Sequence, residues 1–127
     1  MILIDTSAWI AFFRGKGGVA DRVDELIESD EAALCGPVVT ELRRGLRGPA
    51  ERRRVLPLLS ACHDLEQPDD VWREAGELGF HLARLGATVK TLDLLIAAYA
   101  LSHDVAVLTT DRDFGLFGKH GIPLRLA

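Results

Sequence analysis

Two aspartates follow apolar segments that have the composition of buried strands. Asp5 follows Ile2–Ile4, and Asp111 follows a second run, Val105–Thr110. Because the carboxyl ends of parallel strands meet at the sheet edge where ligands bind, both acids are expected to face one crevice. Hard oxygen ligands without cysteine or histidine favour Mg²⁺ or Mn²⁺ over zinc. Divalent ions held in this way serve phosphodiester hydrolysis, because they fix a water molecule and stabilise the leaving oxygen.

Asp93 opens an apolar segment that continues to Leu101 and is expected to form a buried helix. An unpaired carboxylate in such a place is costly unless a cation or hydrogen bonds neutralise it. Two interpretations therefore remain open for Asp93. One is a ligand role, and the other is capping, with Asp93 or Thr91 accepting from free amide groups of the first turn.

Glu41 and Asp113 carry weaker signals. Glu41 lies within a predicted helix, and on its own it is interpreted as a solvated glutamate paired with Arg44 or Arg47. Asp111 and Asp113 also suit turn and capping positions. Taken together, several acids at one sheet edge without a matching cation would repel one another, which favours a bound cation.

The elements that must position these acids alternate between strands and helices. The predicted strands are Ile2–Ile4, Ala32–Cys35, Leu65–Gln67, Val105–Thr109 and Leu124–Leu126. The predicted helices are Ala8–Phe13, Val19–Ser29, a helix from Pro37 to Leu46, Ala50–Ala61, Asp69–Leu85, Thr91–Ser102 and a turn at Phe114–Phe117, with a loop at Arg14–Gly18. This alternation predicts a three-layer α/β/α sandwich with a parallel sheet of about five strands, in one domain spanning residues 1–127.

The composition limits the class of protein. Among 127 residues, 48% are hydrophobic and the net charge is −4, which excludes a disordered chain and binding of nucleic acid by bulk positive charge. The longest apolar stretch, Leu94–Leu101, is too short to cross a membrane, and the N-terminus lacks a basic leader. We therefore expect a cytoplasmic protein in which Cys35 and Cys62 are reduced.

Arginines are concentrated in one stretch of this acidic chain. Six of them fall within twelve residues: Arg43, Arg44, Arg47, Arg52, Arg53 and Arg54. Beside Glu41 they could form a phosphate-binding rim, since a guanidinium group makes bidentate contacts to phosphate. The alternative is a solvated face, and Lys90 is a weaker candidate for phosphate binding.

Four segments form a set that extends over essentially the whole chain: Ile4–Ser7, Thr40–Leu42, Leu92–Ala98 and Leu108–Phe114. In this order they resemble the signatures of PIN-domain proteins, and the resemblance is closest to the VapC ribonuclease toxins of VapBC toxin–antitoxin pairs. The resemblance implies a single PIN domain with a five-stranded parallel sheet. It also implies a magnesium-dependent endoribonuclease, a cognate VapB-like antitoxin and a homodimer.

The same resemblance implies roles for individual residues. The metal would be held by Asp5, Glu41, Asp93 and Asp111, with Asp113 as a fifth, more variable acid. Thr109, with Thr6 or Ser7, would supply hydroxyl groups that orient a carboxylate or the scissile phosphate. No histidine is needed as a base, and a 5′-phosphate product is expected. The histidines, which are His63, His81, His103 and His120, are predicted to be surface or core residues.

Other functions fit parts of the pattern. One is a PIN nuclease of RNA processing without an antitoxin, and another is a non-catalytic module that acts through a partner, for instance in operator repression. A receiver-like phosphoacceptor would require paired acids after the first strand, which Asp5-Thr6-Ser7 does not supply. Trp9, Phe12 and Phe13 are either core residues or part of a groove for the antitoxin, and Trp72 is a candidate dimer contact.

Overall fold

Four short parallel strands form the centre of the protein in a computed structural model that describes residues 1–127. They are β1 (Ile2–Ile4), β2 (Ala32–Leu34), β3 (His63–Asp64) and β4 (Ala106–Leu108), in the spatial order β3-β2-β1-β4. Ile2 is in register with Ala32 of β2 and with Ala106 of β4. The carboxyl ends of β1 and β4 are therefore neighbours, and the segments after Ile4 and Leu108 emerge side by side.

The prediction of about five strands is wrong by one. Leu126 pairs with Val107 only as an isolated parallel bridge, supported by hydrogen bonds from Val107 N to Arg125 O (2.9 Å) and from Ala127 N to Val107 O (2.8 Å). Val105, the residue before β4, donates its amide to Ala100 O (3.0 Å), so the ladder does not extend to the preceding residues. The predicted strand Leu124–Leu126 is thus a single bridge at the sheet edge.

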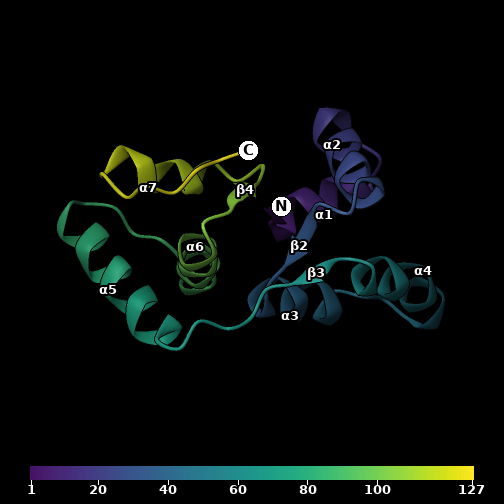
Figure 1. The fold of residues 1–127 in the computed structure, drawn as a ribbon, viewed down its shortest axis with the longest axis horizontal. Helices are drawn as coiled ribbons and strands as arrows, with labels where there is room; N and C mark the ends of the chain where they lie inside the picture. The colour runs from purple at the N-terminus through teal and green to yellow at the C-terminus, as the bar shows by residue number, and fades with distance from the viewer.

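Helices cover both sides of this sheet. They are α1 (Thr6–Phe13), α2 (Gly17–Glu28), α3 (Gly36–Arg44), α4 (Pro49–Ser60), α5 (Val71–Arg84), α6 (Thr91–His103) and α7 (Gly115–Lys119), with a 3₁₀ turn, η1, at Arg112–Phe114. Figure 1 shows α1 and α2 on one side of the strands and α5 and α6 on the other. The predicted α/β class with a parallel sheet between helices is confirmed.

Most predicted elements differ from the observed ones by one or two residues at their ends, and in two cases the difference changes the assignment of a segment. The segment Arg14–Gly18, predicted as a loop, already contains the start of α2 at Gly17. The third strand is His63–Asp64 and not Leu65–Gln67, and Leu65 adds one hydrogen bond from its amide to Leu34 O (2.9 Å). Both errors have the same cause: contacts with residues distant in sequence, more than local sequence, decide where a short helix or strand begins and ends.

Helix α6 lies in the core, as its uniformly apolar composition predicts. All residues from Asp93 to Tyr99, and Ala100, are buried. Helix α5 packs against it at Gly79, where a Cβ atom would lie only 2.8 Å from Leu94 Cδ1. Leu94 follows Asp93 directly, so this close approach helps to hold the first turn of α6 in place. No helix has both the length and the apolar composition that a membrane span requires.

Candidate active site

Asp5 lies where β1 ends and α1 begins, and its carboxylate is held by two hydroxyl groups. Asp5 Oδ2 accepts hydrogen bonds from Ser7 Oγ (2.7 Å) and Thr109 Oγ1 (2.9 Å), and more weakly from the amide of Ser7 (3.4 Å). Asp5 is only 4% exposed. Helix α1 therefore starts at a capping aspartate that is also tied to the end of β4.

The two hydroxyls have little freedom to rotate. Each carries a single proton, which it donates to Asp5 Oδ2, so the 3.1 Å separation of Ser7 Oγ and Thr109 Oγ1 is a contact between two acceptors. Each oxygen in turn accepts from a backbone amide, Ser7 Oγ from Thr110 (3.0 Å) and Thr109 Oγ1 from Asp111 (2.9 Å). Asp5 Oδ1 accepts no hydrogen bond, which leaves it free for a ligand.

Three other acids form the tightest group. One carboxylate oxygen from each of Asp93, Asp111 and Asp113 lies within 4.8 Å of the others. Asp111 follows β4, caps η1 and accepts from the Asp113 amide at 2.9 Å, so its predicted capping role is real. That bond uses Asp111 Oδ1 and does not engage Oδ2, so capping and metal binding are compatible at this residue. Asp113, the most marginal acid in the sequence, is a member of the group.

Asp93 is buried without a partner. Its side chain is 8% exposed, and Oδ2 is fully enclosed with no hydrogen bond. Burial, and then the charge of Asp5, raise the pKa of Asp93 from 3.8 to about 6, although Lys90 lowers it in part. The capping interpretation is wrong, because Lys90 is the N-cap of α6 and no side chain caps this helix. Asp93 instead has the properties of a ligand for a cation.

Glu41 approaches the site from α3. Its Oε1 accepts a hydrogen bond from Thr6 Oγ1 at 2.8 Å, which links α3 to the first turn of α1. None of the ion pairs includes Glu41, so its predicted pairing with Arg44 or Arg47 is wrong. Glu41 lies outside the 4.8 Å group, but its charge contributes to the raised pKa of Asp93.

The five acids fit a hard divalent cation. No lysine, arginine or histidine forms an ion pair with any of them. An enclosed carboxylate oxygen without a partner and three acids within 4.8 Å are the arrangement that Mg²⁺ or Mn²⁺ would stabilise. The donors are all oxygen atoms, and the nearer cysteine, Cys35, has its pKa raised to about 12 by burial, which disfavours a thiolate ligand.

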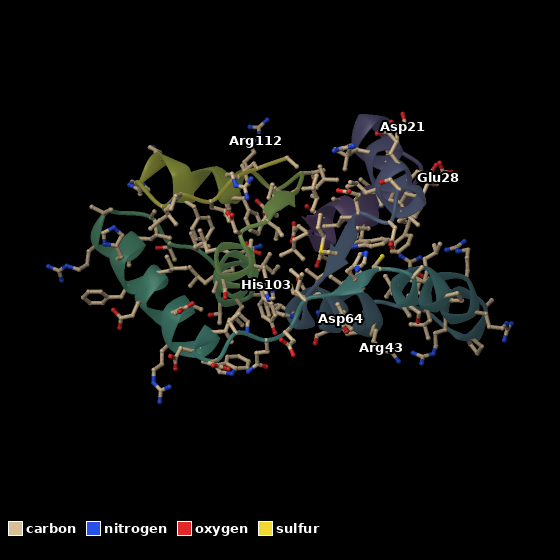
Figure 2. The ribbon with its side chains drawn as sticks, viewed as in Figure 1. Asp21, Glu28, Arg43, Asp64, His103 and Arg112 are labelled. Carbon is tan, nitrogen blue, oxygen red and sulfur yellow. The ribbon has the colours of Figure 1, made fainter.

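The arginine stretch is divided by the fold. Arg47 and Arg54 line a hollow of about 440 Å³ that also contains Thr6 and Glu41. Arg52 and Arg53 line a different hollow, while Arg43 and Arg44 line neither. Figure 2 shows Arg43 directed outward from α3. Proximity to Glu41 in sequence thus does not bring Arg43 and Arg44 to the hollow that contains it.

Arg14 was not identified as a site residue from the sequence, yet it lines the hollow with Arg47 and Arg54. It follows α1 directly, whereas the other two lie after α3 and within α4. No local pattern marks it, because its neighbours are distant in sequence. The one sequence signal for a role of Arg14 is that the short helix α1 begins directly after Asp5, so the far end of this helix remains near the site.

The histidines and aromatic residues behave largely as predicted. His63 and His103 each contact a backbone carbonyl, of Asp30 and Glu66, and neither belongs to the acid group. Trp9 is fully buried, which settles its assignment to the core. Phe13 is half-buried and lines the hollow with Arg47.

Comparison with known proteins gives the same family from sequence and from structure. The PIN domain family model matches residues 2–119. A VapC ribonuclease of Mycobacterium bovis is 32% identical over 124 residues, covering 94% of this chain and 92% of the relative. Ribonuclease VapC5 of Mycobacterium tuberculosis is 35% identical over 118 residues, covering 88% and 84%.

Solved structures share the whole fold. The VapBC2 structure from Rickettsia felis, bound to a promoter DNA fragment, superposes with a TM-score of 0.78 at 20% identity, covering 100% of this chain and 98% of that one. A VapBC-5 toxin–antitoxin structure from Mycobacterium tuberculosis gives a TM-score of 0.66 at 27% identity, covering 98% and 97%. This chain belongs to the PIN-domain family and, within it, to the VapC ribonucleases.

Proposed function

We propose that this protein is an endoribonuclease toxin that hydrolyses RNA phosphodiesters at the acid cluster and is neutralised by a VapB-like antitoxin. The observation that carries the chemistry is the enclosed, unpartnered Oδ2 of Asp93 beside Asp111 and Asp113. The family supports RNA as the substrate, since its curated relatives are named ribonucleases. Acting on RNA, the protein would work in the cytoplasm.

Mg²⁺ is the ion that we assign to the cluster, with Mn²⁺ as a substitute. Asp93, Asp111 and Asp113 would hold it, and Asp5 Oδ1 and Glu41 would complete or extend the site. When bound, the ion supplies positive charge that activates a water molecule and offsets the charge that develops on the phosphate. Without it, the unpaired carboxylates would repel both one another and the RNA backbone.

The chain's own residues would orient the reacting groups. Ser7 and Thr109 donate to Oδ2 of Asp5, so they fix the direction of its free Oδ1. Thr6 does the same for Glu41. Arg14, Arg47 and Arg54 line the adjacent hollow and would bind backbone phosphates, in place of the predicted pair Arg43 and Arg44. Water adds to phosphorus and the 3′-oxygen leaves with a proton, so the products carry a 5′-phosphate and a 3′-hydroxyl.

Apolar residues in the same hollow suggest where an antitoxin would bind. Ile10 is 39% exposed, and Phe13 and Leu46 lie with it beside Arg47. A partner seated there would cover Glu41 and exclude RNA from the acids. Solved structures similar to this chain include VapBC and other toxin–antitoxin complexes, which supports a partner of this kind. A homodimer, which the resemblance implies, stays a prediction.

The decisive experiment incubates purified protein with structured RNA in Mg²⁺ or in excess chelator, and compares it with Asp93→Asn. We expect cleavage only by the unaltered protein in Mg²⁺, with 5′ ends that a 5′-phosphate-dependent exonuclease degrades. Cleavage that survives both the chelator and Asp93→Asn would exclude this mechanism. Co-expression with a cognate VapB-like antitoxin should suppress growth arrest. Ile10→Ala removes apolar contact area without adding a charge beside the arginines, so it should weaken that suppression.

A further inference from the structure

A second hollow flanks the acid cluster and belongs to no part of the site described above. It has a volume of about 300 Å³ and lies among the first turns of α3 and α5, the segment before α5, and the face of α6 that carries Leu92, Leu95 and Tyr99. We propose that this hollow binds one nucleobase of a single-stranded RNA substrate next to the cleaved phosphate. The proposal rests on the ribonuclease function proposed above. The lining residues that matter for it are Thr40, Gln67, Trp72, Leu92, Leu95 and Tyr99.

Two of its walls continue directly into the acid cluster. Thr40 precedes Glu41 on α3, and Leu92 precedes Asp93 on α6. Consecutive Cα atoms are about 3.8 Å apart, so on each of these helices the wall of the hollow begins one residue from an acid. A base held here would therefore hold its own phosphate at the cluster.

The walls suit an aromatic ligand. Trp72 is 65% exposed, which is unusual for so large an apolar side chain, while Leu95 and Tyr99 form a buried floor. Tryptophan and tyrosine rings are common stacking surfaces for unpaired bases. Gly36 keeps the opening beside the tyrosine free, because a Cβ atom there would lie 3.3 Å from Tyr99 Oη.

The absence of charge in the hollow favours a base over a phosphate as its ligand. None of its lining residues is charged, in contrast to the arginine-lined hollow on the other side of Glu41. The polar groups available are the Thr40 hydroxyl and the Gln67 amide, and the side chains of both are exposed and without a hydrogen bond in the chain. A hydroxyl and an amide can both donate and accept, as the edge of a neutral base requires. The arginine-lined hollow would thus bind phosphates of the RNA, and the uncharged hollow would bind one base of the same strand.

The fluorescence of Trp72 tests the proposal directly, because the only other tryptophan, Trp9, is fully buried. The probe is a single-stranded RNA octamer, added with Mg²⁺ to Asp93→Asn protein so that the RNA stays intact. Its control is an abasic octamer of the same length and charge. We expect the RNA to quench Trp72 and the abasic strand to leave it unchanged. Equal quenching by both strands would overturn the proposal.

Cleavage by the otherwise unaltered protein gives an independent readout. We expect Trp72→Ala to lower kcat/KM by about 5- to 150-fold, the factor that the loss of one stacked base produces, and Trp72→Phe to retain most of it. Phe80→Ala is the matched control, since Phe80 is a 61% exposed aromatic on the same helix and lies outside the hollow. Equal activity of Trp72→Ala and Phe80→Ala would overturn the base site while leaving the ribonuclease function intact.

The competing occupant of this hollow is a second copy of the chain, and sedimentation distinguishes it. A base site predicts that Trp72→Ala leaves the oligomeric state unchanged at the concentration used for cleavage. If Trp72→Ala dissociates the protein and loses activity only as it dissociates, the hollow is an interface between copies and the proposal is wrong. If the unaltered protein does not cut RNA at all, the proposed function fails first, and the octamer titration still reports on the hollow.

Discussion

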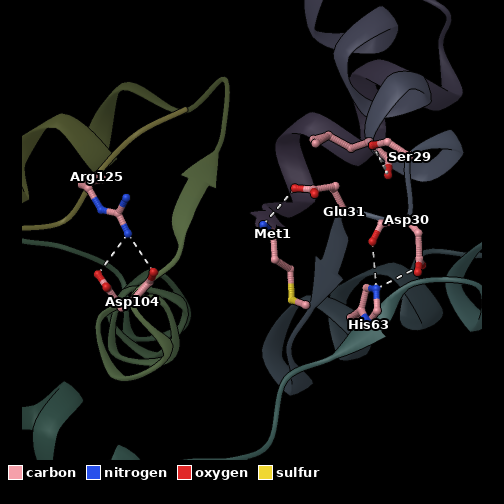
Figure 3. A network of polar contacts seen from close by, with 8 residues as sticks. Met1, Ser29, Asp30, Glu31, His63, Asp104 and Arg125 are labelled. Atoms are coloured by element: carbon pink, nitrogen blue, oxygen red, sulfur yellow. Dashed lines mark hydrogen bonds and ion pairs between the residues drawn. The ribbon is translucent and has the colours of Figure 1, made fainter.

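The amino and carboxyl edges of the sheet both carry acidic residues, but only the acids at the amino edge contact basic groups. Just before β2 and β4, Asp30 contacts His63 Nε2 and Asp104 contacts Arg125 Nη2, each at 3.0 Å, and Glu31 contacts the amino group of Met1 at 3.0 Å. Figure 3 shows these pairs. At the carboxyl edge, neither Asp5 nor any acid of the cluster has such a partner.

The difference shows how a structural acid can be told from a functional one. Asp30 and Asp104 have left-handed backbones, with φ of 60° and 51°, and the partner of each also contacts its backbone carbonyl. These pairs reinforce sharp turns into the strands. The acids of the carboxyl edge are more buried, yet none of them has an ion-pair partner, and hydroxyl groups hold only Asp5 and Glu41. Burial without neutralisation destabilises the protein by itself, so it indicates a ligand.

The largest expected effect is on RNA cleavage. Asp5→Asn should reduce it by at least about 100-fold, because one negative ligand of the proposed ion is lost while the shape is kept. Asp104→Asn is the matched control at the amino edge and should leave the rate within about twofold. Rates are measured with one RNA at saturating Mg²⁺. Equal loss in both variants would mean that the two edges do not differ in function.

Binding of Mg²⁺ at the carboxyl edge should raise the stability of the folded protein. At a free concentration of 100 times Kd, binding adds about 2.7 kcal/mol to the free energy of unfolding, or roughly 10 °C in Tm for a chain of this size. Thermal melting with and without Mg²⁺ measures this shift. Asp104→Asn should keep it and Asp93→Asn should lose most of it. A Tm that does not respond to Mg²⁺ would argue against an ion site in the folded protein.

The metal-free protein should depend on pH through Asp93. Since burial raises its pKa from 3.8 to about 6, the unfolded state ionises first, and the folded state loses stability as the pH rises from about 4 to 6. Above pH 6 the loss is complete, on the order of 3 kcal/mol, because each pKa unit corresponds to about 1.4 kcal/mol. Asp93→Asn should therefore be more stable than the unaltered protein at pH 7.5 in chelator, and the advantage should disappear near pH 4. Urea unfolding at both pH values tests this.

The smallest effect is expected at the amino edge. Arg125→Ala removes an exposed ion pair and a 2.7 Å hydrogen bond to Asp104 O, so it should cost about 1 kcal/mol or less in unfolding free energy and nothing in cleavage. High salt should reduce this cost further. Urea unfolding at low and high ionic strength measures both. A loss of several kcal/mol in unfolding free energy would mean that this pair stabilises the protein far more than an exposed ion pair should.

Much of the fold and of the acid set could be predicted from local sequence. Short apolar runs ending in an acid predicted β1 and β4, and the uniformly apolar segment after Asp93 predicted the buried helix α6, because burial on all sides requires such a composition. Because the alternating elements predicted parallel strands, Asp5 and Asp111 were expected at the same edge of the sheet. The resemblance to PIN domains added Glu41 and Asp93, whose residues alone left other interpretations open.

Only the tertiary structure decided which neighbours each side chain has. It grouped Asp113 with Asp93 and Asp111, gave Glu41 a hydroxyl partner and no arginine, and brought Arg14 beside Arg47. It also reduced the fifth strand to one bridge. The physical reason is the same in each case. A residue's type and the period of its element follow from local sequence, whereas pairing, burial and charge depend on atoms that arrive from distant parts of the chain.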